Sequence, residues 1–322
     1  MSNYTFRLVN HDRKESFVDL DMLRQRPARR PEGTLESGSG PESSLAIDAR
    51  RFVPGQDLED AINTAIAVNE PLLITGEPGT GKTTAAYYTA WKLGLGEVLH
   101  FQVKSETVAK DLLYHFDTVR YFHDAHLAGT QQQALPDKKE YIEEREMWQA
   151  LTAEQPRMLL IDEIDKAPRD FPNDLLHELH EWEFKVPETG QPPVRCNRKN
   201  QPIVFITSNS ERRLPEPFLR RCVYHHIRFD HELIRQIVES RQDEYPALDE
   251  GFRRMAVDRF LRLRESGLRK RPASGELLVW LRILGLRAKE YPRLEEDLAK
   301  LPYLGILIKD HQDLEDIQKR GR

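Results

Sequence analysis

Residues 72–84 read LLITGEPGTGKTT, and this stretch decides the fold. The apolar run at 72–75 predicts a buried parallel strand, because such strands are covered on both faces. The glycines after it predict a tight turn, and residues 82–93 predict a helix. The turn fits the pattern GxxxxGK[ST] without a mismatch, in the order Gly76, Glu77, Pro78, Gly79, Thr80, Gly81, Lys82 and Thr83.

This pattern predicts a phosphate-binding loop. Its backbone N–H groups point inward at the phosphates, and the following helix adds its positive N-terminal end. We expect Lys82 to reach the β- and γ-phosphates, Thr83 to ligate Mg²⁺ and Thr84 to complete the nucleotide contacts. A glycine-rich turn that binds nothing is the alternative, and the flanking strand and helix disfavour it.

A second apolar run, at 158–161, ends in two acidic residues, Asp162 and Glu163. Open α/β sheets bind ligands at the carboxyl ends of their strands, where these carboxylates are expected. Downstream of a phosphate-binding loop, we expect Asp162 to hold Mg²⁺ and Glu163 to orient and polarise the attacking water. An acidic pair alone would more often begin a solvated helix.

The rest of the chain extends the same strand and helix rhythm. Apolar runs at 98–103 and 203–207 predict two more strands, and 57–68 has helical spacing. This alternation predicts an α/β fold with a parallel sheet flanked by helices. After residue 229 the sequence predicts only helices, at 231–241, 252–264 and 275–288. We therefore predict an α/β core at 48–229 and a small all-α domain at 230–322.

Residues 1–47 are expected to form an appendage with a flexible linker. The segment 24–44 reads RQRPARRPEGTLESGSGPESS, which offers few apolar anchors. Such a composition cannot bury enough surface to offset the entropy of ordering. A short strand is possible at 4–9.

Composition limits the classes of protein that remain. No apolar run approaches the roughly 18 residues of a membrane span, and the first residues lack a secretory apolar region. Two cysteines, Cys196 and Cys222, cannot make a disulfide framework. The net charge of -5 gives no bulk attraction to nucleic acid. A cytoplasmic protein with reduced thiols is the expectation.

The sequence resembles the AAA+ ATPases, and within them the MoxR branch. The matching text is GEPGTGKT at 76–83, LLIDEIDKAPRDFPNDLL at 159–176 and ITSNSERRLPEPFLRRC at 206–222. FQVKSETVAKDLLYHFD at 101–117 is also similar to the carbon monoxide dehydrogenase maturation ATPases. The resemblance covers about residues 50–285 and implies a P-loop AAA+ core, a helical lid domain and ATP as the nucleotide.

The resemblance also assigns roles that spacing alone does not. Asn209 matches the sensor 1 position, which helps to place the lytic water. Arg221 matches the arginine finger, with Arg220 as the neighbouring candidate, and such a finger acts on the adjacent subunit. Gly275 occupies the usual place of the sensor 2 arginine. Whether Lys270 or Arg271 substitutes for that arginine stays open.

Two insertions interrupt the predicted core. Residues 102–128 include His115, His123 and His126, which suggest a metal site, although no carboxylate or cysteine completes a recognisable spacing. Residues 184–201 read FKVPETGQPPVRCNRKNQ, which predicts a β-hairpin with a Pro/Gly tip. An ordinary surface loop is an equally good interpretation of that second insertion.

The resemblance implies a remodelling ATPase that forms a homo-oligomeric ring, most simply a hexamer. Such a ring would act on a protein client, for example by inserting a cofactor or metal, with a partner that carries a von Willebrand factor A domain. The alternative is a nucleic-acid loader or motor, favoured by the basic runs at 262–271 and 26–30. The net charge and the lack of an aromatic-rich basic groove argue against it. An intact Glu163 argues against a slow, nucleotide-gated scaffold.

Overall fold

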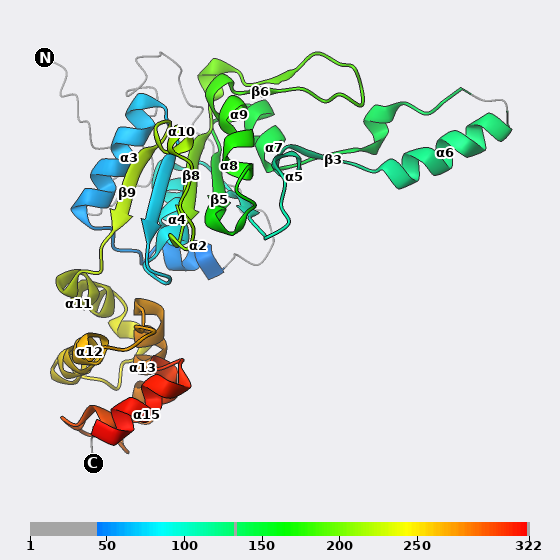
Figure 1. Cartoon of the computed structure of the whole chain (residues 1–322). Coiled ribbons are helices and arrows are strands. Elements are labelled where there is room, and N and C mark those ends of the chain that lie inside the picture. Colours follow the sequence, from blue (N-terminus) through cyan, green and yellow to red (C-terminus); the bar gives the residue numbers. More distant parts are fainter. Residues whose placement is uncertain (1–43, 132–133, 321–322) are drawn as a thin grey trace, which may run out of the picture. The chain divides into compact units, whose positions relative to one another are not determined.

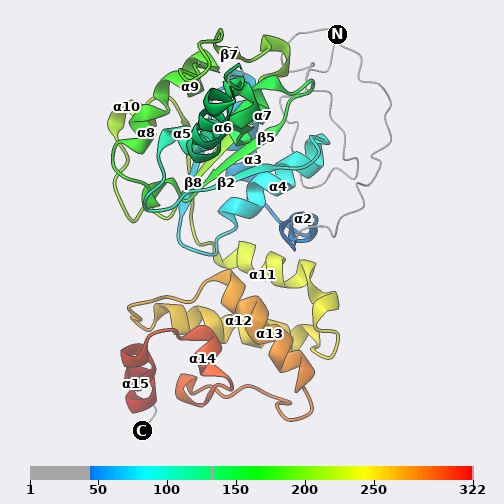
Figure 2. The same ribbon diagram turned by 90° about the vertical axis from the view of Figure 1, so that its right-hand side faces the viewer.

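The computed structural model describes residues 44–131 and 134–320. The predicted strand at 4–9 and the linker, except for its last residue, therefore lie outside the described residues. The chain divides into two compact units (Figures 1 and 2). Among the described residues, the α/β unit holds 44–50, 56–75, 83–131 and 134–226. The helical unit holds 51–55, 76–82 and 227–320, so the phosphate-binding loop packs with it.

A five-stranded sheet forms the centre of the α/β unit, in the order β2-β5-β8-β1-β9. The four predicted strands are confirmed, whereas the edge strand β9 was not predicted. Its residues VYHHI are mostly half-buried or exposed, so they lack the apolar run of a central strand. The bounds are β1 (Leu72–Gly76), β2 (Leu99–Gln102), β5 (Met158–Asp162), β8 (Ile203–Ser208) and β9 (Val223–Ile227).

Strands β2, β5, β8 and β1 pair in parallel. Leu72 lies opposite Phe205, Met158 opposite Ile203, and Leu99 opposite Leu159. The strands β1, β5 and β8 are buried along their whole length, which explains their continuous apolar sequence. Parallel pairing brings the carboxyl ends of these strands to one edge, which we call the carboxyl edge.

Helices flank the sheet, as predicted. One core cluster joins Leu73, Leu159 and Ile206 to apolar residues of several short helices, including Met147 and Phe171. Helix α4 begins at the lysine of the phosphate-binding loop. The bounds are α2 (Ser44–Ala49), α3 (Gln56–Val68), α4 (Lys82–Leu93), α5 (Ala109–Leu113), α7 (Glu146–Thr152), α8 (Phe171–Asp174), α9 (Leu176–Glu181) and α10 (Glu216–Leu219). Short 3-10 turns lie at Ile164–Lys166 and Arg198–Asn200.

Both insertions form two-stranded ribbons. In the first, β3 (Tyr114–Phe116) pairs antiparallel with β4 (Ile142–Glu144). This ribbon carries α6 (Thr118–Thr130) away from the sheet (Figure 1). A 3-10 turn at Lys138–Tyr141 leads back into β4. In the second, β6 (Glu183–Phe184) pairs with β7 (Val194–Arg195), which confirms the predicted hairpin.

The helical unit has its own core. Trp280, Phe260 and Leu284 have no exposed surface, and they join the helices of this unit in one apolar cluster. The three predicted helices are confirmed. The bounds are α11 (His231–Ser240), α12 (Glu250–Glu265), α13 (Ser274–Leu286), α14 (Leu304–Leu307) and α15 (His311–Arg320), with 3-10 turns at Gln242–Glu244 and Leu298–Lys300. Within the described part of the chain, no helix has the length and apolar character to cross a membrane.

Candidate functional site

The phosphate-binding loop requires glycine at two tightly packed positions. Gly79 and Gly81 have φ of +74° and +88°, in the left-handed region that favours glycine. A Cβ at Gly79 would lie 2.8 Å from the Cβ of Ala273, and a Cβ at Gly81 would lie 2.6 Å from Phe52 Cε2. Both glycines therefore serve a close backbone approach as well as a turn.

Lys82 lies at the first position of α4 with 7% of its surface exposed. Its ammonium donates to the carbonyl oxygens of Gly76, at 3.0 Å, and Glu77, at 2.9 Å. The Thr80 hydroxyl also donates to the Glu77 carbonyl, at 2.8 Å. The lysine is thus folded over the loop that the sequence pattern identifies.

Asp162 is the buried centre of the site in the α/β unit, with 5% of its surface exposed. The Thr83 hydroxyl lies 3.0 and 3.2 Å from its two carboxylate oxygens, and His100 Nε2 lies 3.2 Å from Oδ2. The Thr207 hydroxyl also donates to it. Burial acts to raise the pKa of Asp162, but the hydrogen bonds from His100, Thr207 and Thr83 outweigh it, and the pKa is lowered.

A hydroxyl and a carboxylate at hydrogen-bond distance are hard oxygen donors, the kind that Mg²⁺ prefers. Thr83 and Asp162 therefore fit the predicted metal. The other suggested metal site does not assemble: His115 lies on β3, while His123 and His126 lie on α6. Among the described residues, no three His, Cys, Asp or Glu side chains form a group that could hold an ion.

Glu163 follows Asp162 in the chain, and three side chains donate hydrogen bonds to its carboxylate. Asn209 Nδ2 donates to its Oε1 at 3.1 Å, Gln102 Nε2 donates to its Oε2 at 2.7 Å, and the Lys166 ammonium donates to Oε2 as well. The bond to Glu163 raises the pKa of Lys166. The predicted pair of Glu163 and Asn209 is therefore in direct contact.

Asp165 fixes the loop that presents Asn209. It is 2% exposed and accepts hydrogen bonds from the backbone N–H groups of Asn209, at 3.2 Å, and Glu211, at 2.9 Å. The loop after β8 is thereby tied to the turn after β5. Asn209 and Glu163 meet because the two neighbouring strands end at the same edge of the sheet.

The two predicted finger residues lie at the opposite edge of the sheet from the carboxyl edge. Arg220 and Arg221 follow α10, and both are exposed. Arg220 pairs with Glu216 at 2.8 Å. Arg221 borders a small cavity together with Glu70, and Val223 N–H donates to Pro71 O at the start of β1. The structure therefore does not bring the two arginines to Asp162 and Glu163.

The turn before α13 contains the two candidates for the sensor 2 role. Lys270 and Arg271 are both exposed. The backbone N–H groups of Arg269 and Lys270 each donate to the Asp313 carboxylate at 3.0 Å, which fixes the path of the turn. Gly275 lies in the first turn of α13.

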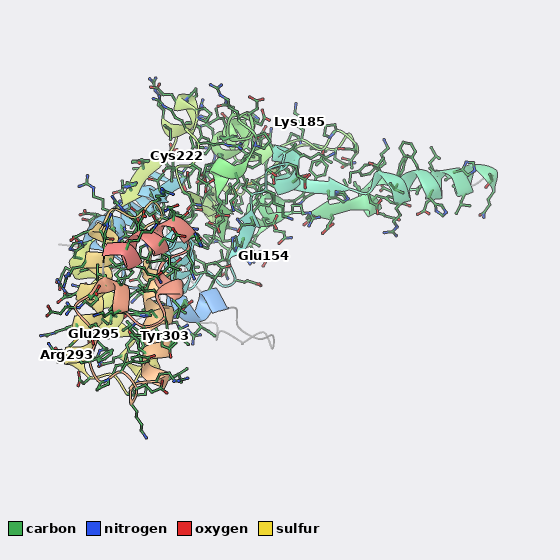
Figure 3. All side chains as sticks on the ribbon, turned by 60° about the horizontal axis from the view of Figure 1, so that its bottom comes forward. Glu154, Lys185, Cys222, Arg293, Glu295 and Tyr303 are labelled. Atoms are coloured by element: carbon green, nitrogen blue, oxygen red, sulfur yellow. The ribbon has the colours of Figure 1, made fainter. Side chains whose placement is uncertain are left out.

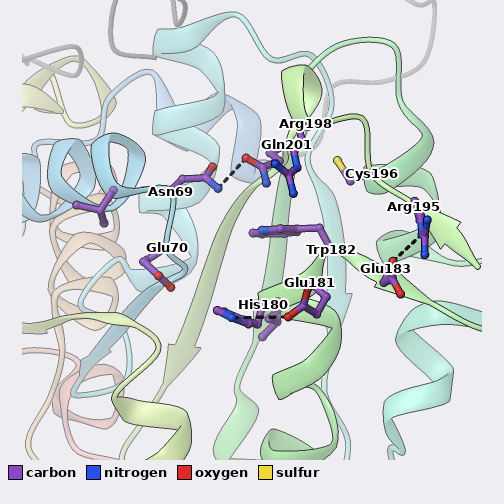
Figure 4. A pocket seen from close by; sticks show the side chains of 12 residues that line it. Asn69, Glu70, His180, Glu181, Trp182, Glu183, Arg195, Cys196, Arg198 and Gln201 are labelled. Carbon is purple, nitrogen blue, oxygen red and sulfur yellow. Dashed lines mark hydrogen bonds and ion pairs between the residues drawn. The ribbon is translucent and has the colours of Figure 1, made fainter. Parts of the chain in front are cut away.

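A pocket of about 700 Å³ lies away from all of these predicted residues (Figure 4). It is lined by residues just before β1, by the end of α9, and by the β6–β7 hairpin and the turn that follows it. Asn69 donates to Gln201 at 2.7 Å across it, and Arg195 pairs with Glu183 at 2.6 Å. Its lining is polar and none of its residues belongs to the phosphate-binding loop or the acidic pair.

Sequence reasoning missed four residues that contact the acidic pair, namely His100, Gln102, Lys166 and Thr207. A signal existed for three of them. His100 and Gln102 stand at the end of the predicted strand 98–103, and Thr207 ends the strand 203–207, so all three belong at the carboxyl edge. Their residue types form no recognised motif, so the sequence alone did not identify them as part of the site.

A known family model covers the stretch of chain that contains these motifs. Residues 71–222 match the family model of the AAA domain, dynein-related subfamily. One solved structure that the chain resembles is a "putative ATPase" from Cytophaga hutchinsonii, at 16% identity and a TM-score of 0.38, covering 85% of this chain and 92% of that one. Among curated proteins, none matches the chain. Residues 71–222 contain the phosphate-binding loop, the acidic pair and Asn209, so these three parts of the site lie within the stretch that matches the AAA domain, and this match supports ATPase activity.

Proposed function

We propose that the chain hydrolyses ATP, with the phosphate-binding loop for the phosphates and the acidic pair for the metal and the attacking water. The observation that carries this proposal is the contact set at the carboxyl edge. Thr83 lies 3.0 Å from Asp162, and Asn209 lies 3.1 Å from Glu163. Three sequence motifs, separated along the chain by 79 residues (Thr83 to Asp162) and by 46 residues (Glu163 to Asn209), thus supply one cluster of the residue types that phosphoryl transfer requires.

Each residue has a separate task in this proposal. Lys82 and the loop N–H groups bind the phosphates, with Gly76, Glu77, Pro78, Gly79, Thr80, Gly81 and Thr84 forming the rest of the cradle. Thr83 and Asp162 hold Mg²⁺, which would neutralise charge on the phosphate oxygens. Glu163 orients the attacking water, and Asn209 holds Glu163 in place.

We further propose that Arg221 completes the site of an adjacent copy. Asp162 ends β5 at the carboxyl edge, whereas Arg221 precedes β9 beside the start of β1. Five residues of strand span about 16 Å, too far for an arginine to serve its own subunit. A homo-oligomeric ring, most simply a hexamer, would place Arg221, with Arg220 as the alternative, against the next subunit's phosphates.

The biological role in this proposal is that of a MoxR-type remodelling ATPase. It would act in the cytoplasm on a protein client, with a partner that carries a von Willebrand factor A domain, and cofactor or metal insertion is one such activity. The division into a core at 48–229 and a lid at 230–322 belongs to the same proposal. The nucleic-acid alternative is weaker, because Arg264 of the basic run 262–271 is buried and paired with Glu77.

Glu163→Gln tests the proposed hydrolysis. The amide keeps the shape of the side chain but cannot polarise water as a carboxylate does. We expect ATP affinity within about threefold of wild type and turnover lowered by about 10² or more. Glu154→Gln, on an exposed glutamate labelled in Figure 3, is the matched control and should keep wild-type turnover. Wild-type turnover by Glu163→Gln would show that another group orients the water.

A further inference from the structure

Arg264 is a buried cation of α12 that no motif explains. Its side chain is 6% exposed. One guanidinium nitrogen donates to Glu77 Oε2 at 2.7 Å, and another donates to the carbonyl oxygen of Pro272. The guanidinium carbon lies 3.6 Å from the centre of the Phe229 ring. The guanidinium thus has two hydrogen-bond partners in its plane and an aromatic ring stacked on it.

The partner of this buried cation is a residue of the phosphate-binding loop. Glu77 is the second residue of that loop, and its carboxylate is 45% exposed while its carbonyl oxygen accepts from Lys82. A second contact reaches the same loop, because the Ser274 hydroxyl donates to Gly79 O at 2.5 Å. These residues all belong to the helical unit. The loop is thus held at two points by residues of α12 and α13.

We propose that Arg264 is a positioning residue for nucleotide binding, which fixes the phosphate-binding loop through Glu77. The inference rests on the proposed binding of ATP phosphates by this loop. The loop backbone must aim several N–H groups at the phosphates at once, and fixing Glu77 reduces the conformational freedom that binding would otherwise remove. Through this ion pair, phosphate binding and the helical unit influence each other.

The chemistry of the pair requires arginine. A planar guanidinium can bond Glu77 and Pro272 in different directions while it stacks on Phe229. An ammonium is a point charge on a flexible stem and cannot satisfy all three contacts. Arg264→Lys therefore keeps the charge but releases the loop, and Glu77→Gln keeps the size of the acid but removes its charge.

The test is a double-mutant cycle on the full chain, with ADP as the probe. Wild type, Glu77→Gln, Arg264→Lys and the double variant are titrated with ADP by calorimetry, and KM and kcat for ATP are measured. We expect each single variant to raise the Kd about tenfold and the double variant to be no worse than either single one. KM should rise while kcat at saturating ATP stays near wild type, because a preorganised loop contributes uniform binding. Arg262→Lys, exposed on the same helix, should leave all values unchanged.

Each outcome decides the inference. Tenfold effects that multiply to about a hundredfold in the double variant would show that the two residues act independently. Lower unfolding temperatures with unchanged Kd values would reduce the pair to a structural contact. If Arg264→Lys does not fold, an unchanged Kd in Glu77→Gln alone overturns the inference. Wild-type protein that binds neither ADP nor ATP would overturn the proposed function itself, and this inference with it.

Discussion

Glu163 combines an uncommon backbone conformation with a carboxylate that accepts hydrogen bonds from three side chains. Its φ of +60° and ψ of +48° lie in the left-handed region. For a residue other than glycine this conformation costs on the order of 1–3 kcal/mol and persists where the surroundings enforce it. The enforcement is visible, since Glu163 N–H donates to the Thr207 hydroxyl at 2.8 Å and Asn209, Gln102 and Lys166 hold the carboxylate.

Asn209→Ala tests whether the hydrogen bond from Asn209 to the Glu163 carboxylate is needed for turnover. Asn209 contacts Glu163 through its amide, so its loss should misplace the water-orienting group and leave the phosphate-binding loop unchanged. We expect kcat to fall about 10²-fold, in the range found when one positioned donor is removed, with KM for ATP within about threefold. Steady-state kinetics measure both. Asn173→Ala, on an exposed asparagine of α8, is the control, and equal rates for the two variants would remove Asn209 from the mechanism.

The lowered pKa of Asp162 predicts a dependence of stability on pH. Because the folded-state pKa lies below the ordinary value of 3.8, the ionised carboxylate stabilises the fold above that value, and this contribution is lost as pH falls through the folded pKa. Urea unfolding of wild type and Asp162→Asn should differ by a constant free energy from pH 7 to about 5. The difference should shrink below about pH 4. A difference that stays constant down to pH 3 would mean that the hydrogen bonds to Asp162 do not stabilise its ionised form in the folded protein.

At the scale of elements, apolar runs and turn residues predicted the central strands and the main helices. Strand β1, the loop and α4 follow from LLITGEPGTGKTT, because a covered strand and a glycine turn leave few alternatives. The edge strand β9 did not follow, since VYHHI pairs on one side only and needs no apolar run. Local sequence also could not show that α6 extends from a ribbon, because β3 and β4 are 25 residues apart and three residues long.

Local sequence patterns likewise predicted only part of the candidate site. The phosphate-binding loop and acidic pair carry recognisable patterns, whereas the partners of Glu163 come from a strand end and a turn with ordinary polar residues. Arg264 gives a further example. In the text RLRESGLRKR it looks like one of several surface cations, yet it is buried against Phe229 and Glu77. Long-range packing decides which arginine of such a run is buried, and one sequence does not contain that information.

Helix α13 gives a prediction about packing in the helical unit. Trp280 has no exposed surface, and its indole N–H donates to Pro302 O at 2.8 Å. Trp280→Ala should lower the free energy of unfolding of this unit by about 3–5 kcal/mol, through a cavity and an unpaired carbonyl. Val279→Ala, next to it and 45% exposed, should change it by less than about 0.5 kcal/mol. Chemical denaturation monitored by far-UV circular dichroism, which reports helix content, compares the two variants. Similar losses of unfolding free energy would contradict the assigned core.

At the scale of the whole molecule, the proposed catalytic residues lie at opposite edges of one sheet. Glu163 and Asn209 lie at the carboxyl edge, whereas Arg221 lies beside the start of β1. In the proposed ring, every active site takes its acid from one copy and its arginine from the next. Arginine fingers are worth about 10³ to 10⁵ in rate where they have been measured. Specific activity should therefore rise with protein concentration as rings form.

The most direct measurement of this claim is complementation between two inactive variants. Glu163→Gln lacks the acid and Arg221→Ala lacks the finger, but a mixed ring contains interfaces with an intact acid on one side and an intact arginine on the other. We predict that each variant alone has less than about 1% of wild-type turnover and that the 1:1 mixture regains on the order of one quarter of it, as random mixing of the two copies gives. Glu154→Gln mixed with Arg221→Ala serves as the reference. Turnover by Arg221→Ala alone at the wild-type rate, or a mixture no more active than its parts, would contradict the shared site.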